Sequence, residues 1–508
     1  MRNMTLRRIA DACGGILHEK NNMGNQEVEC IVTDSRQAGP EALFAAIRGE
    51  RVDGHRFIPA VFEQGALCVL SEQELPEDTK GSWIKVISTL QALKDIAEYY
   101  LRQMNIPVVG ITGSVGKTST KEMIAAVLSQ KYRTLKTLGN FNNELGLPLT
   151  VFRLRDEDEI AVLEMGISDF GEMHRLAKIA RPDTCVITNI GQCHLEFLKD
   201  RDGILRAKTE IFDFLKPDGH IILNGNDDKL ITVRNVDGIE PVFFGLPDQA
   251  GPDVREEGNC ADLSECRDGQ RTVSGADARK DTPEKTENGN SAPELSIWAD
   301  GIQSCGLKGI SCRIHTPQGT FSVLIPIPGQ HMVYNALAGT AVGLTYGLTP
   351  EEIRAGIESL ESLSGRFHII ETEDYTIIDD CYNANPVSMK ASVEVLQDAD
   401  SRRVAILGDM AELGEKETEL HREVGSFAGA CKIEKLIGVG PLCKELVAAA
   451  KEKNPQLDAV HCDTLGQLLE NLEKEVQKGD TILVKASHCM EFGKIVERLQ
   501  SGNAGCEN

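Results

Sequence analysis

A glycine-rich segment at 113–119, which ends in Gly-Lys-Thr-Ser, has the residue types that bind nucleotide phosphates. Apolar residues at 106–111 precede it and predict a buried strand, and an apolar stripe beyond Thr118 predicts a helix. Backbone N–H groups in such a loop, together with the helix dipole, make an anion site. We expect Lys117 to reach the β- and γ-phosphates and the Thr118 hydroxyl to ligate Mg²⁺. The segment therefore predicts a nucleoside triphosphate site, although Gly110 lies one residue outside the strict phosphate-loop spacing.

Three further side chains could complete a phosphate-transfer site. Glu164 ends an apolar segment, 160–164, that predicts a buried strand, and a carboxylate there can hold Mg²⁺ beside a phosphate loop. His194 follows another apolar strand, and Lys208 lies in a predicted helix over 203–215. A lone histidine is more often structural than a ligand, and a helix lysine is by default solvated. From the residues alone, both interpretations of His194 and Lys208 stay open.

Polar clusters follow predicted strands in two other places. Asp34 and Ser35 follow one apolar segment near the N-terminus, and Asp53 and His55 follow the next. Polar residues at strand ends are where an α/β sheet binds ligands, but the same residue types are common in turns and caps. The amide-rich stretch 137–144 has the same two interpretations, because amides either bind a ligand or stabilise turns.

The elements that carry these residues predict an α/β protein of about three domains for a chain of 508 residues. We expect a small N-terminal α/β domain at 1–103, a central nucleotide-binding domain at 104–348 and a C-terminal domain at 349–508. In the last of these, four apolar strands alternate with helices, which predicts a parallel, doubly wound, Rossmann-like sheet. Residues 246–296 are polar and poor in large apolar side chains, so we expect a disordered insertion there.

Composition excludes several classes of partner. The net charge of -24 argues against nucleic acid or an anionic membrane as the main partner. The 15 cysteines include no Cys-x-x-Cys pair, which is typical of reduced thiols in a cytoplasmic protein. There is no apolar run of about 18 residues, so we expect no membrane span. We expect a cytoplasmic monomer.

Together these motifs resemble the Mur ligase family, the ATP-dependent amide-bond-forming enzymes of peptidoglycan precursor synthesis. The resemblance covers nearly the whole chain apart from the insertion, and the shortened loop Thr-Gly-Ser-Val-Gly-Lys-Thr is the family's own form. It implies catalytic roles for Lys117, Glu164, His194 and Lys208, with Lys208 carbamylated by CO₂. It implies a pair of Mg²⁺ ions held by Thr118, Glu164 and His194. The ATP contacts that it implies are Gly113, Ser114, Val115, Gly116, Lys117, Thr118, Ser119, Asn335, Arg366 and Asp380.

The same resemblance implies the substrates. The stretch 379–386, Asp-Asp-Cys-Tyr-Asn-Ala-Asn-Pro, and the stretch 407–414 are similar to those of the dipeptide-adding members. Such an enzyme activates the terminal carboxylate of UDP-N-acetylmuramoyl-tripeptide as an acyl phosphate and joins it to D-Ala-D-Ala. The implied substrate contacts are Asp34, Ser35, Arg36, Asp53, His55, Thr137, Asn140, Asn143, Asn383 and Asn385. Two alternatives remain: a relative that adds a single amino acid, and a P-loop ATPase that is not a ligase.

Overall fold

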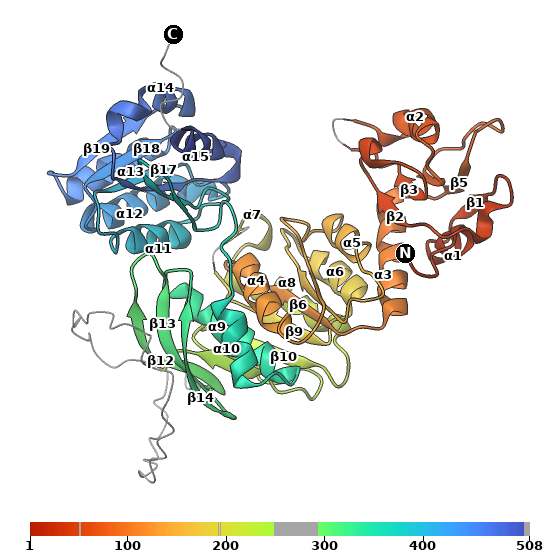
Figure 1. Cartoon of the computed structure of the whole chain (residues 1–508), viewed down its shortest axis with the longest axis horizontal. Coiled ribbons are helices and arrows are strands. Elements are labelled where there is room, and N and C mark those ends of the chain that lie inside the picture. Colours follow the sequence, from red (N-terminus) through yellow and green to blue (C-terminus); the bar gives the residue numbers. More distant parts are fainter. Residues whose placement is uncertain (50–51, 192, 194, 248–292, 502–508) are drawn as a thin grey trace. The chain divides into compact units, whose positions relative to one another are not determined.

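The computed structural model describes residues 1–49, 52–191, 193, 195–247 and 293–501 (Figure 1). Most of the expected insertion at 246–296 lies outside these residues, and so does His194. The predicted fold class is confirmed, because the described chain is a mixed α/β structure with three sheets. No helix among the described residues is both long enough and apolar enough to cross a bilayer.

The N-terminal sheet has the strand order β1-β5-β4-β3-β2. The three pairings from β5 to β2 are parallel, and β1 is antiparallel to β5. Phe44, Val69 and Trp83 are buried together on this sheet and form its core with the helix that follows β3. The elements are α1 (Leu6–Ala12), β1 (Ile16–His18), β2 (Cys30–Val32), β3 (Ala42–Ala45), α2 (Ile58–Glu63), β4 (Cys68–Ser71) and β5 (Ser82–Lys85).

The central sheet has the order β14-β13-β12-β11-β10-β9-β6-β8-β7. Strands β6, β8 and β9 are buried at every position, which explains their continuous apolar sequences. Strands β11 and β12, the parallel pair on either side of the expected insertion, were not predicted from the sequence. The strands are β6 (Val108–Thr112), β7 (Thr134–Lys136), β8 (Ile160–Glu164), β9 (Thr184–Ile187), β10 (His220–Asn224), β11 (Val242–Gly245), β12 (Ile297–Ser304), β13 (Ile310–Thr316) and β14 (Gly319–Ile325).

Helices surround this sheet. Helix α4 packs on β6, β7 and β8, and α3 packs on both α5 and α6. The helix predicted over 203–215 is α8 followed by a 3₁₀ turn at Glu210–Phe214. The helices are α3 (Thr89–Met104), α4 (Lys117–Leu128), α5 (Gly146–Val151), α6 (Glu172–Ala180), α7 (Leu195–Leu198), α8 (Arg201–Thr209), α9 (His331–Thr345) and α10 (Pro350–Glu358).

The C-terminal sheet has the order β15-β16-β20-β17-β18-β19. The prediction of four parallel strands was incomplete, because β19 adds a fifth parallel strand and β15 pairs antiparallel with β16. The elements are β15 (His368–Glu371), β16 (Thr376–Asp379), α11 (Pro386–Leu396), β17 (Arg403–Gly408), α12 (Glu417–Ala430), β18 (Lys435–Val439), α13 (Cys443–Lys453), β19 (Asp458–Cys462), α14 (Leu465–Glu475), β20 (Thr481–Lys485) and α15 (Gly493–Gln500).

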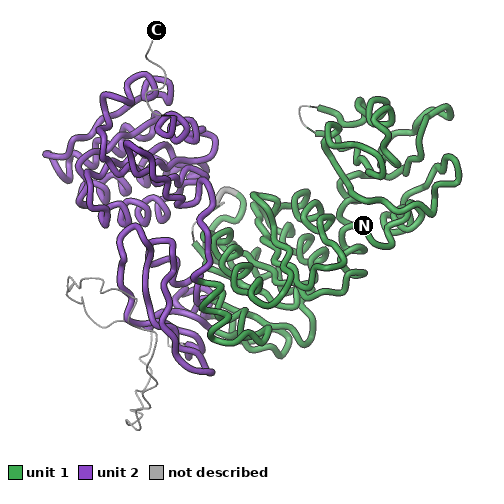
Figure 2. The backbone as a smooth tube through the Cα atoms, in the orientation of Figure 1, with its two compact units in different colours: residues 1–223, 232–242, 338–357 green, residues 224–231, 243–337, 358–508 purple. Residues whose placement is uncertain are grey.

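By contacts within the chain, the molecule forms two compact units (Figure 2). The first comprises Met1–Leu223, Thr232–Val242 and Ala338–Ile357, and it contains the N-terminal sheet and the glycine-rich loop. The second comprises Asn224–Ile231, Phe243–Leu337 and Glu358–Asn508, and it contains the C-terminal sheet.

Candidate active site

The glycine-rich loop connects the end of β6 to the start of α4, as the sequence predicts. Gly113 has φ +149° and Gly116 has φ +79°, values that favour glycine. A Cβ atom on Gly113 would lie 1.9 Å from the Thr188 hydroxyl oxygen, so no larger residue fits there without a shift. Because α4 begins at Lys117, the loop also sits at the positive end of a helix dipole.

The segment after β9 holds the loop in shape. The Ser114 N–H donates to the Asn189 carbonyl at 3.0 Å, and the Val115 N–H donates to the Asn189 side-chain oxygen at 3.0 Å. The Thr188 hydroxyl and the Asn189 amide donate in turn to the Val115 carbonyl, at 2.7 and 3.0 Å. These contacts fix the loop backbone before any ligand arrives, which lowers the conformational cost of binding an anion.

Lys117 lies over the loop that it follows. Its ammonium donates to the carbonyl of Gly113 at 2.9 Å and to that of Ser114 at 3.4 Å. The positive charge is therefore held at the loop by the chain itself. A phosphate on the loop N–H groups would lie within reach of this charge.

Glu164, at the end of β8, is a buried carboxylate, and among the described residues only one of its two oxygens has hydrogen-bond partners. Its side chain Oε1 accepts from the Thr118 hydroxyl at 3.2 Å and from the Asn142 amide at 2.8 Å. Its Oε2 is buried and accepts no hydrogen bond from the described residues. An unpartnered buried carboxylate oxygen is costly unless a cation or donor reaches it.

This arrangement fits Mg²⁺, which prefers carboxylate and hydroxyl oxygens beside substrate phosphates. Two of the three predicted ligands, Thr118 and Glu164, are brought together. The third, His194, lies outside the described residues.

Lys208, on α8, is 1% exposed, so the default interpretation of it as a solvated helix lysine is wrong. Burial, and after it the positive charge of Lys117, lower the pKa of its ammonium from 10.5 to about 7. Cys193 acts in the opposite direction. Much of this amine is therefore neutral and nucleophilic near pH 7.

In the second unit, Asp380 follows β16 and is tied to Lys485 on β20. The Lys485 ammonium, 2% exposed, donates to Asp380 at 2.6 Å, and the Ser392 hydroxyl donates to the same oxygen at 2.6 Å. The guanidinium of Arg366 lies over the ring of Tyr382, 3.9 Å from its centroid. Arg366 and Asp380, predicted from resemblance, thus come from one edge of this sheet, where Lys485 was not predicted.

The amides predicted in the second unit have local partners. Asn385 is the N-cap of α11 and accepts from the Ser388 N–H at 2.9 Å. Asn383 is exposed and accepts from the Ala384 N–H at 2.8 Å. Asn335 is buried on α9. Only Asn383 therefore presents a side chain largely open to solvent.

The predicted N-terminal residues form two hydrogen-bonded turns. Asp34 caps the turn that contains Ser35, and hydrogen bonds from Arg36 lower the pKa of Asp34 to about 2. His55 Nε2 accepts from the Glu72 N–H at 2.9 Å, so its Nδ1 carries the proton that is shared with Asp53 at 2.6 Å. Both ring nitrogens of His55 have partners within the fold. This agrees with the interpretation of these residues as turn and cap residues.

The amide-rich stretch contributes a residue that was not predicted from the sequence. Asn142 reaches Glu164, whereas the Asn143 side chain accepts from the N–H of Gly146, the first residue of α5, at 2.8 Å. Asn140 is exposed, and Thr137 is fully buried. The high content of amides predicted that this loop is part of the site, but only the structure shows that Asn142 is the amide that contacts Glu164.

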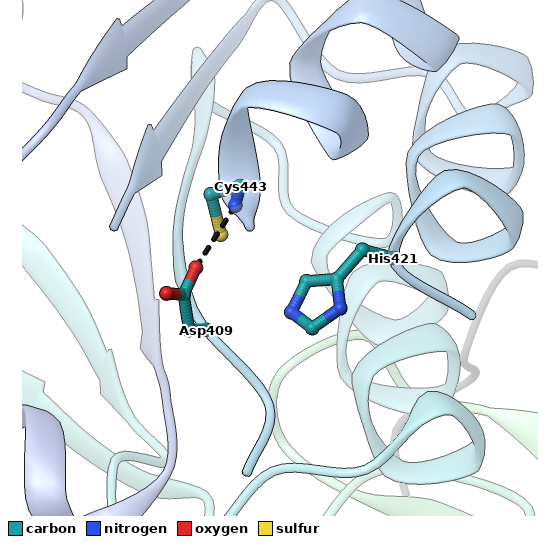
Figure 3. Close-up of side chains that lie close together, drawn as sticks. All are labelled: Asp409, His421 and Cys443. Carbon is teal, nitrogen blue, oxygen red and sulfur yellow. Dashed lines mark hydrogen bonds between the residues drawn. The ribbon is translucent and has the colours of Figure 1, made fainter. Parts of the chain in front are cut away.

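A second group of possible metal ligands, Asp409, His421 and Cys443, lies in the C-terminal region (Figure 3). The ring of His421 accepts from the Met410 N–H at 2.9 Å and donates to the Glu417 carbonyl at 2.7 Å. Asp409 accepts from the Cys443 N–H at 2.9 Å, and burial raises the pKa of the Cys443 thiol. Both ring nitrogens of His421 already have partners, and burial favours the protonated thiol of Cys443, so we interpret the group as a structural link between β17, α12 and α13.

Three regions of the chain match models of known domains. Residues 27–110 match the catalytic domain of the Mur ligase family, residues 111–343 the Mur ligase middle domain, and residues 365–488 the Mur ligase glutamate ligase domain.

The chain is also similar to individual Mur ligases over nearly its whole length. The chain is 35% identical to the UDP-N-acetylmuramoyl-tripeptide–D-alanyl-D-alanine ligase of Bacillus subtilis, with 97% of this chain and 98% of that protein covered. It is 31% identical to the ligase of the same name from Escherichia coli, with both chains fully covered at 100%.

The fold is also similar to the solved structures of such ligases. The crystal structure of MurF from Acinetobacter baumannii matches with a TM-score of 0.80 and 30% identity over 98% of this chain and 99% of that one. The MurF ligase of Thermotoga maritima, solved in complex with ADP, matches with a TM-score of 0.73 and 26% identity over 93% of this chain and 97% of that one. The domain order, the relatives and the loop geometry together show that the chain belongs to the Mur ligase family.

Proposed function

We propose that this chain is an ATP-dependent ligase that joins D-alanyl-D-alanine to the terminal carboxylate of UDP-N-acetylmuramoyl-tripeptide in peptidoglycan precursor synthesis. The substrates follow from the names of its relatives. The observation that carries the chemistry is that Lys117 and Thr118 lie at the glycine-rich loop and that Thr118 donates to Glu164 of β8. The buried Lys208 lies close enough for the charge of Lys117 to lower its pKa.

In the reaction, a carboxylate oxygen of the nucleotide tripeptide attacks the γ-phosphorus of ATP and ADP leaves. The product is an acyl phosphate. The amine of D-Ala-D-Ala then attacks the acyl carbon, inorganic phosphate leaves, and the amine loses a proton to solvent. The loop N–H groups and Lys117 stabilise the negative charge that develops on the phosphates.

Thr118 and Glu164 would hold Mg²⁺, and we propose His194 as a further ligand in a site for a pair of ions. Bound Mg²⁺ supplies positive charge that offsets the charge of the phosphates. The unpartnered Oε2 of Glu164 supports this proposal.

We propose that Lys208 is carbamylated. Its neutral amine attacks the carbon of CO₂, a C–N bond forms, and the nitrogen loses a proton, which leaves a carbamate anion. The lowered pKa of Lys208 supports this step, because only the neutral amine reacts. The ammonium of Lys117 would then stabilise the anion.

The remaining predicted contacts are also part of this proposal. Residues 1–103 would bind the uridine nucleotide through Asp34, Ser35, Arg36, Asp53 and His55, with His55 acting by orienting Asp53. Residues 104–348 would bind ATP, and residues 349–508 would bind the dipeptide. Substrate contacts from Thr137, Asn140, Asn143, Asn383 and Asn385, and ATP contacts from Asn335, Arg366 and Asp380, are proposed from resemblance. We propose that the chain acts as a monomer.

Phosphate release tests this function. The purified chain is given ATP, Mg²⁺ and UDP-N-acetylmuramoyl-tripeptide with D-Ala-D-Ala, with single D- or L-amino acids, or with no amine. We expect sustained phosphate release only with the dipeptide, and a product heavier by one dipeptide less water. Equal turnover with a single amino acid would favour another Mur-type ligase, and rapid ATP hydrolysis without either substrate would favour an ATPase.

A further inference from the structure

Lys121 is a fully buried lysine that the proposed reaction does not use. It lies on α4, one turn beyond the glycine-rich loop, and is 0% exposed. Its ammonium donates to the Thr137 carbonyl at 2.7 Å and pairs with Glu122 at 2.7 Å. Because a buried charge is costly, a lysine held in this way needs a structural reason.

Thr137 connects Lys121 to Glu164. The Glu164 N–H donates to the Thr137 hydroxyl oxygen at 3.0 Å, and the Thr137 N–H donates to the Val162 carbonyl at 3.1 Å. Thr137 is therefore bonded to β8 on both sides of Leu163, and its carbonyl is held from α4 by Lys121.

The loop that starts at Thr137 also carries Asn142. The Asn142 amide fixes Oε1 of Glu164, and the Asn142 carbonyl accepts from the Gly166 N–H at 2.8 Å. One loop thus holds Glu164 through its backbone and its side chain. Oε2 of Glu164 accepts no hydrogen bond from the described residues and is therefore available to a cation.

We propose that Lys121 and Thr137 are positioning residues that fix the metal-binding carboxylate of Glu164 relative to Thr118. The inference rests on the proposed role of Glu164 in holding Mg²⁺. Lys121 sets the distance between α4, which carries Thr118, and the loop that grips Glu164. Groups that orient a metal ligand typically contribute about 10- to 100-fold to metal affinity.

On this inference Thr137 acts through Glu164, as an alternative to the substrate contact proposed above. This differs from the role that resemblance suggests for Thr137, and the two roles predict different changes in its variants.

The test measures metal binding without turnover. The affinity of the full chain for a non-hydrolysable ATP analogue is measured by calorimetry with Mg²⁺ and with EDTA, and the ratio gives the gain due to Mg²⁺. Lys121→Met and Thr137→Val are expected to reduce this gain by about tenfold or more, with little change in the affinity measured in EDTA.

Lys136→Met is the matched control. Lys136 pairs with the other oxygen of Glu122, but its side chain is 39% exposed and it does not hold the Thr137 carbonyl. We expect Lys136→Met to retain the full gain from Mg²⁺. Thermal unfolding of each variant shows that it is folded, and Thr137→Val, a substitution of similar volume, serves if Lys121→Met does not fold.

Glu164→Gln separates the inference from the proposed function. If Glu164→Gln loses the gain from Mg²⁺ while folded Thr137→Val and Lys121→Met keep it, the positioning role is wrong and the metal site stands. If Glu164→Gln keeps the gain, or the unchanged chain shows none, the metal site itself is wrong. A Thr137→Val variant with a raised KM for the nucleotide tripeptide and an unchanged Mg²⁺ gain would establish the substrate role instead.

Discussion

Carbamylation of Lys208 should depend on pH in a way that its burial determines. With a pKa of about 7, the neutral fraction of the amine is about 9% at pH 6 and about 91% at pH 8. At a fixed concentration of dissolved CO₂, the rate of carbamylation should thus rise about tenfold over this range and level off above pH 8. A solvated lysine with a pKa of about 10.4 would show a rise of about 100-fold over the same range, with no levelling.

The assay starts from protein freed of CO₂ at low pH. Labelled bicarbonate is added, the carbamate carbon is followed by ¹³C NMR, and recovery of ligase activity is measured in parallel samples. The Lys208→Ala variant is the control and should show neither the signal nor turnover, and formate or acetate should restore part of its rate. A rate that climbs without levelling would refute the argument from burial, and a fully active Lys208→Ala variant would refute the role of this lysine.

The glycine-rich loop gives two further predictions. Lys117→Ala should abolish turnover while the free energy of unfolding changes by less than about 2 kcal/mol, since only hydrogen bonds to two carbonyls are lost; near-normal phosphate release would rule out the assignment of the loop. Gly113→Ala should weaken ATP binding and destabilise the fold by about 1–3 kcal/mol, because Gly113 has a φ of +149° and the added Cβ would meet Thr188. Gly139→Ala is the control: Gly139 has a φ of +51° with open space around it, so this variant should leave ATP binding unchanged. Denaturant unfolding and nucleotide titration measure both, and equal ATP affinity in the two glycine variants would contradict the role of the close contact.

The parts of the fold that the sequence predicted are those set by local pattern. The strand expected at 160–164 is β8, and the turn and helix at the glycine-rich loop lie where the glycines and the apolar stripe indicate. β11 and β12 were missed because they pair across a long polar stretch, which no local pattern reveals. β15 was missed because a short antiparallel edge strand beside a glycine turn looks like a loop.

At the site, residue type alone could not separate ligands from caps. Asn385 caps α11, and Asn143 accepts from the first N–H of α5, roles for which asparagine is as well suited as for binding a ligand. Asn142, between two amides that were selected, faces Glu164 only because of the turn of its loop. The burial of Lys208 and Lys121 depends on elements that pack over α8 and α4 from elsewhere in the chain, so the sequence could not show it.

The central claim is that ATP activates a carboxylate, and the fate of the carboxylate oxygens tests it most directly. UDP-N-acetylmuramoyl-tripeptide labelled with ¹⁸O in its terminal carboxylate is turned over with ATP and D-Ala-D-Ala, and the released phosphate is analysed by mass spectrometry. The acyl phosphate mechanism predicts that each phosphate carries one labelled oxygen, because the bond between carbon and that oxygen breaks when the amine attacks. Unlabelled phosphate, with the oxygen supplied by water, would contradict it.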